Sequence, residues 1–75
     1  MKELVEFIAK SLVDNPDEVT VNEIIGEQSI ILELKVAPED MGRVIGKQGR
    51  IAKAIRTVIK SVAIKQNKRV IVEII

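Results

Sequence analysis

The stretch VIGKQGRIAKAIRTVIKSV, residues 44–62, decides the fold predicted for this chain. Its two glycines, Gly46 and Gly49, bracket Lys47 and Gln48, and glycine readily interrupts a helix. After the second glycine, apolar and basic residues recur at helical spacing on opposite sides of a helical wheel. The apolar side holds Ile51, Ile55, Val58, Ile59 and Val62, and the basic side holds Arg50, Lys53, Arg56 and Lys60. We therefore expect a bend followed by an amphipathic helix that runs to Lys65.

A short helix is expected directly before this bend. Pro38 suits the first turn of a helix, and Glu39 and Asp40 place negative charge near the positive end of the helix dipole. Gly46 follows about two turns later. The glycines therefore separate a short helix from a longer one.

Outside these two helices, the sequence predicts one further helix and three strands. Apolar residues recur at helical spacing from Leu4 to Leu12, and they include Phe7, which we expect in the core. Residues 18–25 and 29–36 have the period of strands and predict an antiparallel hairpin, and residues 69–75 predict a closing strand. The fold class is therefore α+β: one domain, residues 1–75, with three helices on one face of a three-stranded mixed sheet.

Composition excludes several functions. The 75 residues contain neither cysteine nor histidine, so thiolate metal sites and a histidine base for catalysis are excluded. The acidic residues form no metal-site pattern, and no cofactor fingerprint is present, so we expect neither an enzyme nor a cofactor. We also see no signal peptide and no run of about 20 apolar residues that could span a membrane. A cytoplasmic protein is the expectation.

The charges are distributed unevenly along the chain. Residues 1–40 hold three lysines against ten acidic residues, a net charge of −7, and residues 41–75 hold nine basic residues against Glu73 alone, a net charge of +8. This asymmetry favours a polyanion as the partner of one face. Alternatively, the two halves attract each other within the fold.

The segment from Gly46 to Gly49 has two interpretations. It is either a plain corner between helices, in which one glycine supplies a left-handed C-cap, or a backbone that lets a sugar-phosphate chain approach closely. The second interpretation also accounts for Lys47, Arg50 and Lys53, since the amide groups at the start of the next helix attract anions as well. A nucleotide-binding P-loop is excluded, because its lysine must follow the second glycine and precede a Ser or Thr.

The segment Val44-Ile45-Gly46-Lys47-Gln48-Gly49-Arg50-Ile51 resembles the [IV]-I-G-x-x-G-x-x-[IV] core of the KH domain. Ile51 falls one place before the last apolar position of that pattern, and Ile55 continues the apolar face. The predicted element order is similar to the prokaryotic, type II KH fold. Over its whole length the chain resembles the small, single-domain bacterial KH RNA-binding proteins of the KhpA (YlqC) family.

The resemblance implies a non-catalytic module that grips about four nucleotides of single-stranded RNA at the GxxG loop. The RNA-binding residues that it implies are Arg43, Val44, Ile45, Gly46, Lys47, Gln48, Gly49, Arg50 and Lys53. Val44 and Ile45 could instead belong to the core, and Ile45 is the stronger core candidate of the two. One residue from 30–34 should line the floor of the base-binding groove. The family also implies an RNA chaperone or post-transcriptional regulator.

Two further observations bear on the partner. Phe7 is the only aromatic residue, so the stacking platforms of RRM and OB-fold proteins cannot be built here, whereas aliphatic side chains suffice for a KH groove. The alternative function is a protein-interaction module, because the aliphatic strand at residues 70–75 offers an edge for pairing. The resemblance implies the same, with a homodimer or a larger KH-containing partner of the KhpB/Jag type.

Overall fold

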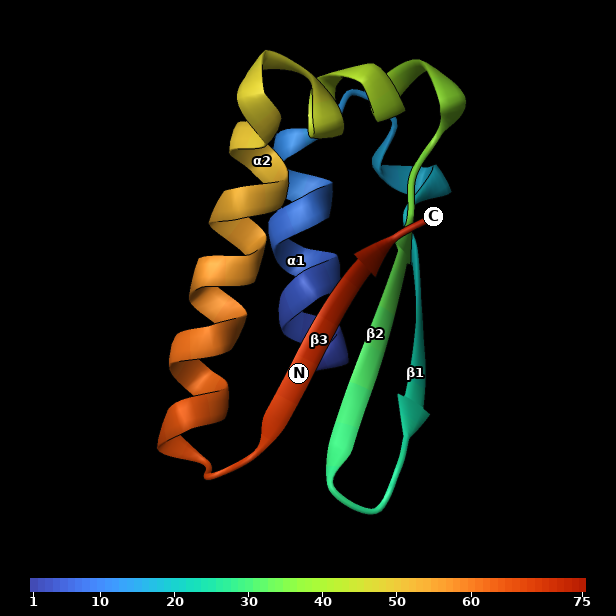
Figure 1. The fold of residues 1–75 in the computed structure, drawn as a ribbon. Coiled ribbons are helices and arrows are strands. Elements are labelled where there is room, and N and C mark those ends of the chain that lie inside the picture. The colour runs from blue at the N-terminus through green and yellow to red at the C-terminus, as the bar shows by residue number, and fades with distance from the viewer.

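The computed structural model describes residues 1–46 and 48–75. Its helices and strands confirm the predicted order and fold class (Figure 1). Glu18, which was expected to open the first strand, instead ends a short 3-10 helix, which begins at Pro16 because proline fits the first position of a helical turn. The elements are α1 (Lys2–Leu12), η1 (Pro16–Glu18), β1 (Thr20–Ile25), β2 (Ser29–Lys35), α2 (Pro38–Lys65) and β3 (Arg69–Ile74).

The predicted break between two helices is present as a bend inside α2. Gln48 and Gly49 both have positive φ angles, 65° and 66°, which a straight right-handed helix does not contain. We call residues 38–46 the first arm and residues 50–65 the second arm. Figure 1 shows the first arm crossing the top of the view and the second arm descending beside β3.

The three strands form a mixed sheet in the order β1-β2-β3. β1 pairs with β2 antiparallel, as the hairpin predicts, and β2 pairs with β3 in parallel, with Leu32 opposite Val72. A parallel pair needs a long crossover connection, and α2 supplies it. β3 is therefore an edge strand, and one of its sides faces the second arm of α2.

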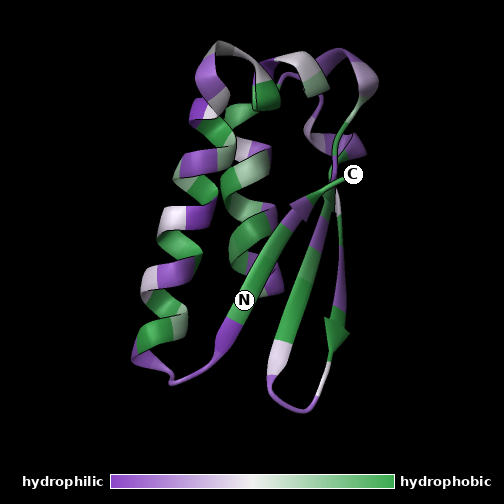
Figure 2. Ribbon diagram, viewed as in Figure 1, coloured by the Kyte–Doolittle hydropathy of each residue, from purple (hydrophilic) through white to green (hydrophobic). Residues whose placement is uncertain are grey.

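The core lies between the helices and one face of the sheet. Leu32 and Leu34 alternate inward from β2, and Ile55 and Ile59 meet them from the second arm, all four with side chains that are essentially inaccessible to solvent. Figure 2 shows hydrophobic and hydrophilic residues alternating along each turn of the second arm. In the described part of the chain, no helix combines the length and the apolar character needed to cross a membrane.

The prediction that Phe7 belongs to the core was wrong, since Phe7 is 70% exposed. α1 buries Val5 and Ala9 instead. At 100° per residue, Phe7 lies about 200° from Val5, which is the far side of the helix. The single aromatic side chain is therefore on the surface.

Candidate nucleic-acid interface

The bend of α2 holds its backbone in a conformation that only some residues tolerate. Gly49 has no Cβ, so a positive φ of 66° costs it little. Gln48 has nearly the same φ, 65°, and a residue with a side chain adopts that region rarely. Such positions cluster at ligand-binding and switch segments, and they also occur in turns, as Asn67 does after α2.

The two glycines have different roles in the backbone of the bend. Gly49 supplies the left-handed conformation that the sequence predicts for one of them, whereas Gly46 has no positive φ. Beyond its chain neighbours and the backbone of its own helix, a Cβ added at Gly46 would meet no atom within 4 Å. Neither the backbone nor the packing of the folded chain therefore requires glycine at position 46, and the space beside it is open to a ligand.

A groove runs from the bend along the second arm to the end of β3, and its volume is about 360 Å³. Four predicted site residues, Ile45, Gln48, Gly49 and Lys53, line it together. Three residues that the sequence did not assign to the site complete its lining. We call this set the loop-side groove: Ile45, Gln48, Gly49, Ala52, Lys53, Arg56 and Ile74.

One of the three missed residues, Arg56, carried a signal in the sequence. Arg56 follows Lys53 by three positions and so lies on the same face of a helix. In the structure its Nε donates a hydrogen bond of 3.4 Å to the carbonyl oxygen of Val72, so Arg56 bridges the second arm and β3. No residue from 30–34, where the floor of the base-binding groove was expected, lines the loop-side groove. β2 is the central strand, and β3, through Ile74, borders the groove instead.

Of the two apolar residues before the bend, only Ile45 lies where the prediction of a site residue places it. Val44 is fully buried in the core, so its side chain cannot contact a ligand. Ile45, which was the stronger candidate for the core, is 54% exposed and lines the loop-side groove. Val44 follows the buried Asp40 by four positions and so shares its face of the helix, whereas Ile45 is turned about 100° away.

Arg43 and Arg50 lie in a different place from the other predicted residues. Both line a separate depression of about 540 Å³, together with Leu12, Gly42 and Ile51. Arg43 also forms an ion pair with Asp14, with 3.0 Å between Nη2 and Oδ2. The structure does not bring these two arginines into the loop-side groove. The prediction for Lys47 lies outside the described residues.

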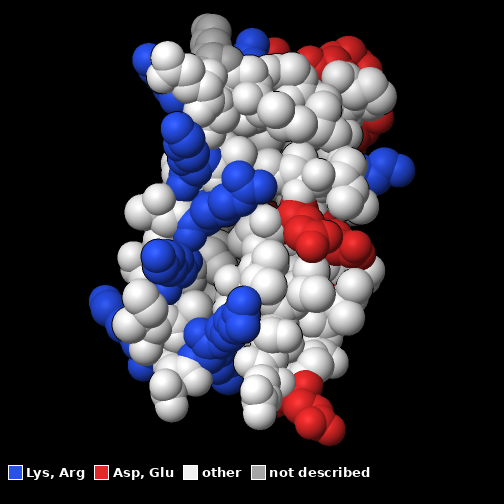
Figure 3. All heavy atoms as spheres, viewed as in Figure 1, with Lys and Arg blue, Asp and Glu red and all other residues white. Residues whose placement is uncertain are grey.

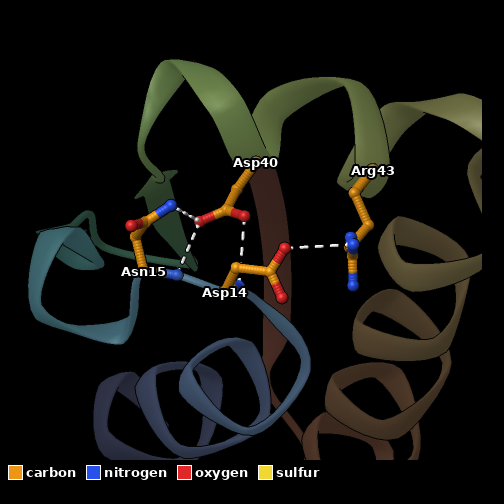
Figure 4. Close-up of polar contacts among 4 residues, drawn as sticks. All are labelled: Asp14, Asn15, Asp40 and Arg43. Carbon is orange, nitrogen blue, oxygen red and sulfur yellow. Dashed lines mark hydrogen bonds and ion pairs between the residues drawn. The ribbon is translucent and has the colours of Figure 1, made fainter.

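A buried carboxylate fixes the start of the first arm (Figure 4). Asp40 is 1% exposed and accepts hydrogen bonds from the backbone N–H groups of Asp14 and Asn15, at 3.1 and 3.0 Å, and from Asn15 Nδ2, at 3.1 Å. Burial raises the pKa of Asp40, but these hydrogen bonds and the nearby charge of Arg43 outweigh it, so the pKa is lowered overall. Asp40 therefore ties α2 to the turn after α1, in addition to its expected place in the first helical turn.

Positive charge gathers on the face that contains the groove. Figure 3 shows lysine and arginine side chains along α2 and over its junction with β3, whereas the acidic side chains in this view lie over the strands and at the upper right, with one basic side chain near them. Within the described part of the chain, the Arg43–Asp14 pair is the one ion pair between the acidic and basic halves. The two halves are therefore not joined by a network of ion pairs, and the groove-side cations are not neutralised in that way.

The order of the elements and the open bend beside a cationic helix and an edge strand are those of a KH domain. Comparison with known protein families identifies one particular family of KH-domain proteins. A family model described as "KhpA/KhpB, KH domain" matches residues 2–74, and the chain belongs to this family. The resemblance stated from the sequence is thereby confirmed.

Curated relatives match over the full length of this chain. "RNA-binding protein KhpA" of Clostridium acetobutylicum is 81% identical over 75 residues, which is 100% of both chains. The protein of the same name from Clostridium perfringens is 79% identical, also over 100% of both chains. The one from Aquifex aeolicus is 52% identical over 100% of this chain and 95% of its own. No solved structure matches this chain.

Proposed function

We propose that residues 1–75 act as one KH module that binds single-stranded RNA without catalysing a reaction. The observation that carries this proposal is the open bend of α2. Gly46 and Gly49 meet no atom within 4 Å of where a Cβ would stand, and the loop-side groove begins beside them. The curated relatives are named as RNA-binding proteins, which supports RNA as the polyanion.

The RNA backbone passes over the bend, and the bases enter the loop-side groove. Gln48, Lys53 and Arg56 offer the polar and cationic groups of this groove, while Ile45, Ala52 and Ile74 offer aliphatic surface for the bases. The groove has no aromatic residue on which bases could stack. We therefore expect modest affinity, about micromolar, which corresponds to about −8 kcal/mol.

Substitutions of Gln48 test this proposal. Asp and Asn both tolerate the left-handed backbone that Gln48 adopts, so Gln48→Asp and Gln48→Asn should both fold. Only Asp adds negative charge against the phosphates. We expect Gln48→Asp to weaken binding of a degenerate eight-nucleotide RNA at least tenfold, and Gln48→Asn to weaken it much less.

Fluorescence anisotropy with labelled RNA measures the affinities, and urea unfolding verifies that both variants are folded. Equal affinity of the Asp and Asn variants would show that the bend does not contact the phosphates, and the proposed site would then be rejected.

We also propose a biological role for this RNA binding. Binding of modest affinity without stacking platforms suits a protein that visits many RNAs, as an RNA chaperone or a post-transcriptional regulator in the cytoplasm does. Crosslinking in cells followed by sequencing of the bound fragments identifies these RNAs. Recovery of no RNA above background would reject this role.

Pairing with a second copy, or with a larger KH-containing protein of the KhpB/Jag type, is a second candidate function. Apolar side chains left in solvent favour it: Phe7 on α1 is 70% exposed, and Val58 on the second arm is 41% exposed. Phe7→Ser should therefore weaken self-association in sedimentation equilibrium. Ile25→Ser is the matched control, since Ile25 is 71% exposed at the end of β1. A monomer at tens of micromolar, unchanged by either substitution or by the partner, would reject pairing.

A further inference from the structure

Arg56 separates the loop-side groove from a neighbouring hollow and lines both. This second hollow has a volume of about 440 Å³ and lies between the second arm and β3. Its wall includes Ile59, Ile64 and Val70, and its rim includes Lys60. The second hollow therefore extends the path from the bend toward the opposite end of the molecule.

At that opposite end, two turns meet and form polar hollows. One turn joins β1 to β2, and the other joins α2 to β3. The hollows there have volumes of about 590 and 430 Å³, and both are lined by Lys68 and Arg69, which also line the second hollow. We call the shared lining residues the far-end cluster: Gln28, Ser29, Asn67, Lys68 and Arg69.

The composition of the far-end cluster suits a phosphate. Lys68 and Arg69 supply two cations, and the remaining three side chains are polar and uncharged. Glu27 is the one acidic residue that lines these hollows in the described part of the chain, and it lies in the hollow on the β1 side. Neither Lys68 nor Arg69 forms a salt bridge within that part, so both charges face solvent.

We propose that the far-end cluster is a second phosphate-binding site, which holds the RNA strand that leaves the loop-side groove. The strand would run along the second arm past Arg56, and the protein would grip it at both ends. This inference rests on the proposed function. A continuous polyanion is the occupant that the cationic rim favours, because Arg56, Lys60, Lys68 and Arg69 all line the hollow beyond Arg56 and no acidic residue does.

Dependence on RNA length tests the far-end cluster. The probes are degenerate RNA oligonucleotides of four and eight nucleotides, since a GxxG loop alone clamps about four. An eight-nucleotide strand offers about five registers to a four-nucleotide site, so a gain of about fivefold needs no second site. We expect the longer RNA to bind at least tenfold more tightly than this register effect allows.

Charge removal tests the same site without changing the RNA. Lys68→Gln with Arg69→Gln should weaken the eight-nucleotide RNA about tenfold at 0.1 M salt and reduce the slope of log K against log salt by about 1.4. Binding of the four-nucleotide RNA should change less than twofold. Lys10→Gln with Lys65→Gln is the matched control, because it removes two exposed cations that lie outside these hollows.

The outcomes separate the two proposals. If Gln48→Asp weakens both RNAs while the Lys68 and Arg69 substitutions act no differently from the control pair, the far-end cluster is rejected and the bend is retained. If Gln48→Asp weakens neither RNA, the proposed function itself fails. A change in sedimentation with unchanged RNA affinity on substitution of Lys68 and Arg69 would assign the far-end cluster to a protein contact and overturn the inference.

Discussion

At the scale of single residues, Gly46 and Gly49 separate what the fold needs from what a ligand needs. Gly49 serves the backbone, because it adopts a positive φ. Gly46 serves neither backbone nor packing, because its φ is not positive and the space around it is open. The two substitutions to alanine should therefore have opposite effects on stability.

Gly46→Ala should raise the free energy of unfolding by up to about 1 kcal/mol, the usual difference between alanine and glycine within a helix. The same substitution should weaken RNA binding at least tenfold, because the added methyl group occupies the path of the phosphate backbone. Gly49→Ala should lower the free energy of unfolding by about 1–2 kcal/mol, since alanine is strained at positive φ. Urea unfolding and RNA anisotropy measure both quantities.

Gly42→Ala is the control for this comparison. Gly42 also lies in the first arm and has no atom within 4 Å of a Cβ, but it lines the depression that holds Arg43 and Arg50. It should gain stability as Gly46→Ala does and keep its RNA affinity. Loss of RNA binding in both variants would mean that helix stiffness, rather than access to the backbone, governs binding.

Predictions for single residues succeeded where a local backbone rule applied. They failed where packing against other elements decides which side chain is buried. A glycine with left-handed backbone was expected between the helices, and Gly49 is that residue. The choice between Val44 and Ile45 depends on which face of the first arm packs on the core, and that face is the one that holds Asp40. The prediction for Phe7 failed because it rested on the hydrophobicity of the side chain. A helical wheel centred on Val5 and Ala9 places Phe7 on the outer side of α1.

At the scale of elements, the hydrogen bonds of Asp40 link the turn after α1 to the start of α2. These hydrogen bonds favour the ionised form and lower the pKa of Asp40 in the folded protein below its ordinary value of about 3.9. The stabilisation is therefore fully present above the pKa of the unfolded chain and is lost as the pH falls through the folded pKa.

Asp40→Asn should lower the urea midpoint at pH 7, and the deficit relative to the unchanged protein should shrink as the pH falls below about 4. Urea titrations at a series of pH values measure the deficit. Glu39→Gln is the control, because Glu39 is an exposed neighbour in the same helical turn. A deficit that stays constant from neutral to acidic pH would show that Asp40 acts by shape and not by charge.

The sequence predicted the elements better than it predicted their junctions. The end of α2 at Lys65 and the start of β3 at Arg69 agree with the expected limits, because periodicity and the turn residues between them are local signals. The role of Asp40 was only half visible. Its place in the first turn of a helix was predicted, but the partners Asp14 and Asn15 are 26 and 25 residues away in sequence.

At the scale of the whole molecule, the separation of charge along the sequence becomes a separation between faces. The nine basic residues after Gly42 include all the cations of the loop-side groove and the far-end cluster. This outcome was predictable from the sequence, whereas the strand beside the groove was not. Sheet order follows from the parallel crossover of α2, and only the assembled fold shows that β3 takes the edge next to the second arm.

The parallel pairing of β2 with β3 also has a kinetic consequence. Ile30 pairs with Val70, forty positions along the chain, so this ladder closes only after the long intervening segment has been ordered. β3 supplies Val72 to the hydrophobic core and Ile74 to one wall of the groove. Partially folded forms that lack β3 do not have a complete groove. A ligand that contacts both α2 and β3 therefore binds the folded form and should slow its unfolding.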